Sequence, residues 1–165
     1  MAFPVLESPM ATLSELTDTY LAGPAALRAA VAGMTREQTL ARPVAGKWST
    51  LEVVAHLADF EPIIADRVKR MIAFTKPILF GADPDPMAAK LAYHDRDLEE
   101  ELQLIELTRK SLGRVLRTLD ATALTRECIH TDRGLLTLEQ ILTLAGKHIA
   151  THLPFIAAKR QALGV

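Results

Sequence analysis

Apolar residues recur every three or four positions over four long stretches of the chain, which is the spacing of one face of an α-helix. We expect helices at about residues 12–32, 50–74, 95–119 and 138–162. The clearest apolar face, on the third helix, consists of Leu98, Leu102, Ile105, Leu112, Leu116 and Leu119. Four such helices predict an all-α antiparallel bundle with a ligand site between facing helices.

Local signals fix where two of these helices begin. Ser49 is followed three residues later by Glu52, and Thr137 is followed by Gln140. Both pairs fit a capping box, in which the two residues satisfy the first free N–H groups of a helix. Three prolines fall inside predicted helices, where each removes a backbone hydrogen bond and favours a kink or, at the first of them, a restart of the helix. They are Pro24, Pro62 and Pro154.

The connections between the helices differ greatly in length. Residues 76–94, between the second and third helices, are interrupted by prolines and a glycine, with a short helical turn expected near 87–91. A connection this long is either a lid or binding loop, or a poorly ordered linker. Residues 125–130 should form a short extended segment before the fourth helix, turned by residues 132–134. The start, up to Ser8, should be an irregular lead-in.

Composition agrees with one helical domain over residues 1–165. Apolar residues make up 49% of the chain but aromatic residues only 5%, and a core rich in Leu, Ala, Ile and Val is typical of bundles. The net charge is −1 with both signs interspersed, so no basic patch indicates nucleic-acid binding. We see no membrane-spanning run and no signal peptide at the start, and the single Cys128 has no partner for an intramolecular disulfide. We expect a cytoplasmic protein.

Three histidines lie on apolar helix faces. His148 and His152, four residues apart, share one face of the fourth helix, and His56 lies on a face of the second helix. The other members of these faces are Ile141, Ala145 and Phe155 on the fourth helix and Val53, Phe60, Ile63 and Arg67 on the second. Buried imidazoles need a partner, and three of them form a ligand set typical of a catalytic zinc or similar ion. The alternative is three histidines satisfied separately by carbonyls or water.

Further candidates surround His56 in the sequence. Asp59, one turn later, could be a general base, an acceptor for an imidazole N–H, or a solvated carboxylate. Glu61 is better interpreted as a solvated carboxylate on the outer face. Phe60 and Tyr93 could line a pocket, although core packing is the stronger expectation for Phe60.

Two other side chains could form a nucleophilic pair. Cys128 and His130 alternate onto one side of the predicted extended segment. A small buried cysteine and a surface histidine are favoured over a catalytic pair. Trp48, just before the Ser49 cap, should be a packing anchor for the second helix.

Two segments resemble the signatures of a known family. Residues 46–49 (Gly-Lys-Trp-Ser) with 52–59, and residues 135–138 with 145–153, are similar to the two signatures of the DinB/YfiT-like superfamily. The resemblance spans roughly residues 10–162. The chain departs from it in carrying Thr151-His152 where many members have two adjacent histidines, and in carrying Pro154.

This resemblance implies an up-down-down-up four-helix bundle, often a homodimer. It also implies one divalent metal ion, such as zinc or nickel, held by His56, His148 and His152. Some members of the superfamily are metal-dependent transferases or isomerases that use low-molecular-weight thiols such as bacillithiol or mycothiol.

We therefore expect a metal-dependent enzyme in which the ion activates a thiol or water for transfer, isomerisation or hydrolysis of a small molecule. Residues 76–94 would partly cover the site. The alternative is a non-catalytic dimeric bundle whose histidines hold metal only incidentally.

Overall fold

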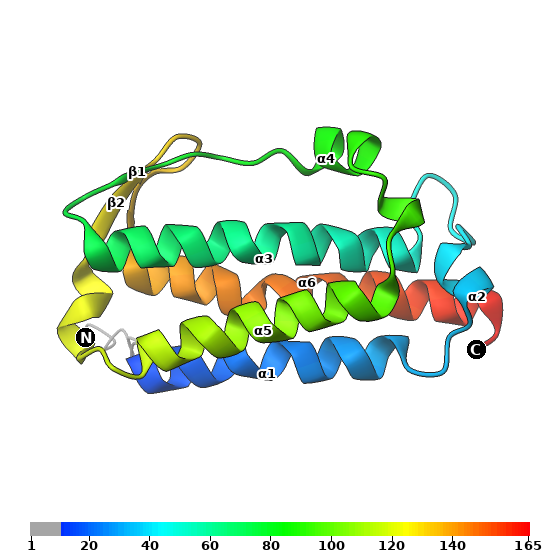
Figure 1. Cartoon of the computed structure of the whole chain (residues 1–165), viewed down its shortest axis with the longest axis horizontal. Helices are drawn as coiled ribbons and strands as arrows, with labels where there is room; N and C mark the ends of the chain where they lie inside the picture. The colour runs from blue at the N-terminus through cyan, green and yellow to red at the C-terminus, as the bar shows by residue number, and fades with distance from the viewer. Residues whose placement is uncertain (1–10) are drawn as a thin grey trace, which may run out of the picture.

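Four long helices form a bundle in the computed structural model, which describes residues 11–165 (Figure 1). They are α1 (Leu13–Val31), α3 (Thr50–Ala73), α5 (Leu98–Leu116) and α6 (Leu138–Leu163). The four predicted helices are thus confirmed, with small differences at their ends. The predicted irregular start up to Ser8 lies outside the described residues.

The helix directions are up-down-down-up, since α1 and α6 run one way along the bundle and α3 and α5 run the other way (Figure 1). Both α1 and α3 pack against α5 and α6. Because α3 and α5 are consecutive and parallel, the chain must return along the bundle between them. The 24 residues of α3 span about 36 Å at 1.5 Å per residue, which explains the long connection at 76–94. A wholly antiparallel bundle, the expectation from the pattern alone, is wrong for this pair.

The connections contain the short elements. Two short helices lie in these connections, α2 (Arg36–Leu40) and α4 (Pro84–Lys90). The described residues also contain two 3₁₀ turns, η1 (Tyr93–Asp95) and η2 (Ala121–Thr125), and three strands, β1 (Ile78–Leu79), β2 (Glu127–His130) and β3 (Gly134–Thr137). β2 confirms the predicted extended segment and forms an antiparallel hairpin with β3. The long connection at residues 76–94, here called the crossover segment, adds β1 to this hairpin. β1 pairs with β2 in parallel, with Ile78 opposite Ile129. The sequence did not predict β1, because two residues carry no alternation.

Side-chain caps begin the bundle helices as their sequences require. Both predicted capping boxes are present, at Ser49–Glu52 and Thr137–Gln140, and α1 begins with a third at Thr12–Glu15. The three prolines lie inside continuous helices, so α1 does not restart at Pro24.

A buried polar layer separates two apolar clusters in the core. One cluster contains the early part of α1 with the late parts of α3 and α5, and the other contains the opposite halves. Between them, Arg109 Nε lies 2.9 Å from Glu61 Oε2, and both side chains are almost completely buried. The Tyr20 hydroxyl donates to Glu61 Oε1 at 2.6 Å. The expectation that Glu61 is solvated is therefore wrong.

The sequence of α1 makes room for this layer. Pro24 has no N–H, so the carbonyl of Tyr20 loses its helical donor, and Arg109 Nη1 donates to it at 2.6 Å. A Cβ atom on Gly23 would lie only 2.4 Å from Arg109 Nη1, so the close approach requires glycine at this position. Arg109 Nη2 also donates to the carbonyl of Ala145 on α6, at 3.2 Å.

We expect a large loss of stability when the Arg109 side chain is removed from the polar layer. Arg109→Ala leaves the Glu61 carboxylate buried without its cation, so we expect the free energy of unfolding to fall by about 3–5 kcal/mol in urea denaturation. The matched control is Arg117→Ala, which breaks an exposed ion pair with Asp18 and should cost no more than about 1 kcal/mol. Equal losses in the two variants would contradict a dominant role for the layer.

Candidate metal centre

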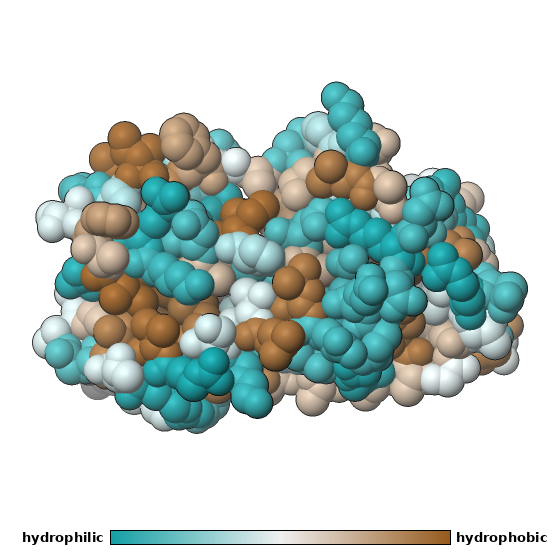
Figure 2. Space-filling view, in the orientation of Figure 1, coloured by the Kyte–Doolittle hydropathy of each residue, from teal (hydrophilic) through white to brown (hydrophobic). Residues whose placement is uncertain are grey.

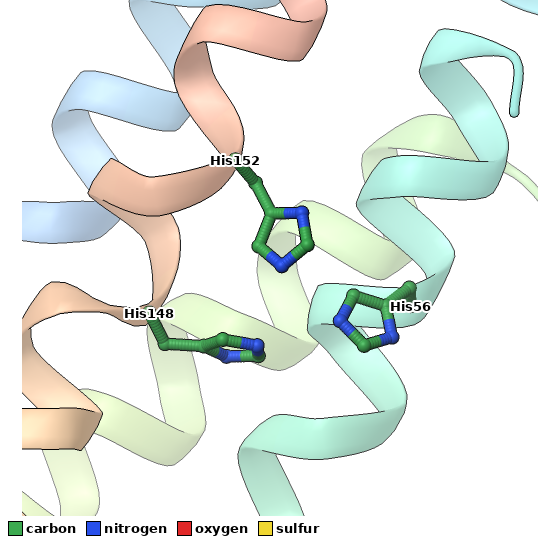
Figure 3. A group of neighbouring side chains, drawn as sticks. All are labelled: His56, His148 and His152. Atoms are coloured by element: carbon green, nitrogen blue, oxygen red, sulfur yellow. The ribbon is translucent and has the colours of Figure 1, made fainter. Parts of the chain in front are cut away.

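The predicted histidines converge between two neighbouring helices. α3 supplies His56, and α6 supplies His148 and His152 from successive turns (Figure 3). One nitrogen of each ring lies within 4.8 Å of the corresponding atoms of the other two. The ring centroids are 4.8 to 5.3 Å apart. The two helix faces identified in the sequence therefore meet at one point.

The three rings are held in a state suited to metal binding. The Nδ1 atoms of His56, His148 and His152 are all buried, and no group among residues 11–165 pairs with them. Burial lowers the pKa of His56 to about 4 and that of His148 to about 3. Burial also lowers the pKa of His152. Neutral imidazoles without protein partners are ligands for zinc, nickel and similar ions, so the donor set fits a divalent metal.

Neighbouring groups add to the effect of burial on the pKa of His148. After burial, the causes that lower its pKa are the neighbouring histidines and Arg109. The guanidinium of the core layer thus acts on His148 as well as on Glu61.

Aromatic rings surround the cluster. Phe60 lies one turn after His56, with ring centroids 4.5 Å apart, and lies 5.9 Å from His148. Trp48 lies 5.3 Å from His56 and packs against the adjacent apolar cluster, as expected for an anchor of α3. Phe155 lies beside His152 but is half exposed, so the expectation that it faces the core is wrong.

Two cavities border the cluster on different sides. The first, about 380 Å³, has His148 and Phe60 in its wall. The second, about 400 Å³, has His152, Trp48 and Phe155 in its wall. A small molecule in either cavity would lie against a histidine of the cluster. The crossover segment contributes Ala82 to the first cavity, and so covers part of it.

Two other candidates from the sequence lie elsewhere. Both carboxylate oxygens of Asp59 accept from Arg96, at 2.7 and 3.0 Å, and neither accepts from a histidine. The Tyr93 ring is buried with the Arg96 guanidinium 4.8 Å from its centre, beside a separate cavity. The catalytic role of Asp59 stays a prediction, but its oxygens are used in an ion pair.

The cysteine and histidine of β2 both point inward. Cys128 is fully buried, as expected, but His130 is only 5% exposed and lines the first cavity, so the expectation of a surface histidine is wrong. Burial raises the pKa of the Cys128 thiol, which opposes the thiolate form that a nucleophile needs. His130 Nδ1 accepts from the backbone N–H of Asp132 at 3.2 Å.

The first cavity also contains functional candidates that the sequence did not single out. Arg67, at the end of the His56 face, lines it together with Lys147 and Arg133. The position of Arg67 on a histidine-bearing apolar face was visible in the sequence. The contribution of Arg133 depends on the hairpin between β2 and β3, which no local signal links to α3.

The fold and the histidine cluster define a class: helical bundles with a candidate metal site between facing helices. The chain belongs to the DinB superfamily, whose family model matches residues 19–156. None of the helices within residues 11–165 is both long and apolar enough to span a membrane.

Individual relatives agree with this assignment. A protein of Oceanobacillus iheyensis named "putative metal-dependent hydrolase" is 26% identical over 141 residues, which are 84% of this chain and 81% of the relative. The fold also matches that of YfiT from Bacillus subtilis, described as a probable metal-dependent hydrolase with an unusual four-helix bundle topology. The TM-score is 0.86 at 24% identity, and the match covers 99% of this chain and 94% of YfiT.

The ion pair of Asp59 predicts a structural effect of its removal. Asp59→Ala leaves the partly buried Arg96 without its bidentate partner, so the free energy of unfolding should fall by about 1–3 kcal/mol. Because Asp59 forms no hydrogen bond with a histidine of the cluster, the divalent metal content of the variant should equal that of the unmodified protein when both are measured by elemental analysis. A variant of normal stability that has lost its metal would instead assign Asp59 to the metal site.

Proposed function

We propose that the protein is a divalent-metal-dependent enzyme that hydrolyses a small molecule, with the metal held by His56, His148 and His152. The observation that carries this proposal is the convergence of three neutral imidazoles at the edge of two cavities, each with a buried Nδ1 atom that has no protein partner. A relative named "putative metal-dependent hydrolase" and YfiT, described as a "probable metal-dependent hydrolase", support the same reaction class.

The chain supplies the features such chemistry needs. Three imidazole ligands are the number that catalytic zinc sites use, whereas structural sites commonly close with four ligands, many of them thiolates. A bound divalent ion would supply Lewis-acid chemistry, polarising a substrate oxygen or activating a nucleophile. Phe60 and Trp48 shield His56 from solvent, and the two cavities leave space beside His148 and His152 for substrate.

Metal content tests the ligand set directly. Protein purified without a tag should contain about one divalent ion per chain, zinc or nickel, as measured by elemental analysis. The His148→Ala/His152→Ala variant should lose it, because two of three ligands are gone. The control is His94→Ala, which removes a histidine beside Glu52 and should leave the metal content unchanged.

Two outcomes contradict this ligand set. One is an unmodified protein that takes up no ion on dialysis against zinc or nickel, and the other is a double variant that keeps its ion. The first outcome would favour a non-catalytic helical bundle.

A second candidate reaction is transfer or isomerisation with a low-molecular-weight thiol, which the thiol-using members of the family suggest. The presence of two cavities on different sides of the cluster favours this candidate, because each could hold one reactant.

For hydrolysis, we expect esters or amides to be turned over by the metal-loaded protein without added thiol. Turnover that appears only when bacillithiol or mycothiol is added would replace hydrolysis by thiol transfer.

We also propose that the protein is a homodimer. Large apolar side chains are exposed on and near the small sheet, among them Phe74, Ile78, Phe80, Ile129 and Leu135. Figure 2 shows more apolar surface at this end of the molecule than at the opposite end, where polar side chains dominate.

Light scattering should give twice the mass of one chain, and Phe80→Asp should give a monomer. A single-chain mass for the unmodified protein at high concentration would contradict this proposal.

A further inference from the structure

The cavity beside His148 combines apolar walls with an excess of positive charge. Its apolar lining includes Phe60, Ile64, Ile141, Leu144 and Ala145. Its charged lining consists of Arg67, Arg133 and Lys147 against the single carboxylate of Asp132. Within residues 11–165, none of these three cations forms an ion pair. An excess of positive charge over negative charge favours an anionic ligand.

Arg67 is the most constrained of these cations. Its Nη2 donates to the carbonyl of Phe80 in the crossover segment at 2.5 Å, which fixes the guanidinium. Its Nε is buried and has no hydrogen-bond partner among the described residues. A buried charged donor without a partner costs free energy, because it has lost water and gained nothing in exchange. A ligand oxygen would supply the missing acceptor.

Arg67 and His148 lie at different levels along the bundle. Arg67 follows His56 by eleven residues, which is three helical turns, so it lies on the same face of α3 about 16 Å further along the axis. α6 runs antiparallel to α3 (Figure 1), and its Ile141 precedes His148 by seven residues, or about 10 Å. The cavity thus extends along both helices, with His148 toward one end and Arg67 toward the other.

We propose that this cavity binds a small molecule with an apolar body and a terminal carboxylate, and that Arg67 binds the carboxylate. Lys147 and Arg133 add positive potential around it, and the apolar side chains contact the body. The other end of the molecule would lie at His148. Only that last point rests on the proposed metal-dependent hydrolysis, because anion binding by Arg67 needs no metal.

A pair of isosteric probes tests the charge requirement. Octanoate and octanamide have the same length and apolar body, but only octanoate is charged. We would titrate each into ¹⁵N-labelled protein and follow the backbone signals and the Arg67 Nε–H signal by NMR. Octanoate should bind at least about tenfold more tightly than octanamide and should shift the Arg67 Nε–H signal. Equal affinities, or no binding of octanoate, would overturn the proposal.

Matched variants locate the anion. Arg67→Gln should weaken octanoate binding by about tenfold or more and leave octanamide binding unchanged, whereas Arg67→Lys, which keeps the charge, should retain most of the affinity. The control Arg114→Gln makes the same change at an exposed position on α5, outside the cavity lining, and should bind both probes normally. Normal octanoate affinity in a folded Arg67→Gln variant would overturn the proposal.

A histidine variant separates this proposal from the metal site. His56→Ala/His152→Ala removes two proposed ligands, neither of which lines this cavity. Octanoate should bind it as it binds the unmodified protein, even if neither protein contains metal. If binding is lost in this variant but kept in Arg67→Gln, the carboxylate is held at the histidine cluster and the assignment to Arg67 is wrong.

Discussion

The buried guanidinium of Arg109 is the contact on which the arrangement of the whole bundle depends. It comes from α5 and is bound by a carbonyl of α1, a carboxylate of α3 and a carbonyl of α6. A charge this deep in the core is tolerated only when its partners are in place. All four helices must therefore meet at one level, with each helix at one position along the bundle axis. Apolar packing alone tolerates small shifts along that axis, whereas this set of contacts does not.

The same contact joins the fold to the candidate metal centre. Arg109 lies at the level of His148, and its charge helps to keep that histidine neutral. Gly23 and Pro24 on α1 help to position this guanidinium. Gly23 leaves room for it, and Pro24 leaves the carbonyl of Tyr20 free to accept its hydrogen bond. Residues that never contact a ligand thus position a charge that adds to the effect of burial on His148.

The sequence predicted what depends on local spacing. Helical periodicity and capping pairs such as Ser49–Glu52 located the four helices, because these signals arise within a few residues. His56, His148 and His152 could be grouped because each lies on an apolar face, and apolar faces meet in the core. The resemblance to the DinB family supplied the helix directions, which local patterns do not contain.

Features that depend on distant partners could not be predicted. Glu61 and Arg109 are 48 positions apart, and each alone has the appearance of a solvent-exposed charge. Asp59 was a candidate base because it lies one turn from His56, yet its orientation is decided by Arg96 from another element. Strand β1 exists only because the crossover passes β2.

The crossover at residues 76–94 has a consequence for how relatives can diverge. It is required by the parallel order of α3 and α5, yet it also supplies the Phe80 carbonyl and Ala82 at the cavity beside His148. It contributes no ligand to the histidine cluster and only Leu79 and Tyr93 to the buried apolar residues. Changes in its length or sequence can therefore reshape the cavity while the bundle and the histidines stay constant. Relatives can therefore differ in which small molecule fits this cavity while they keep the same bundle and the same histidines.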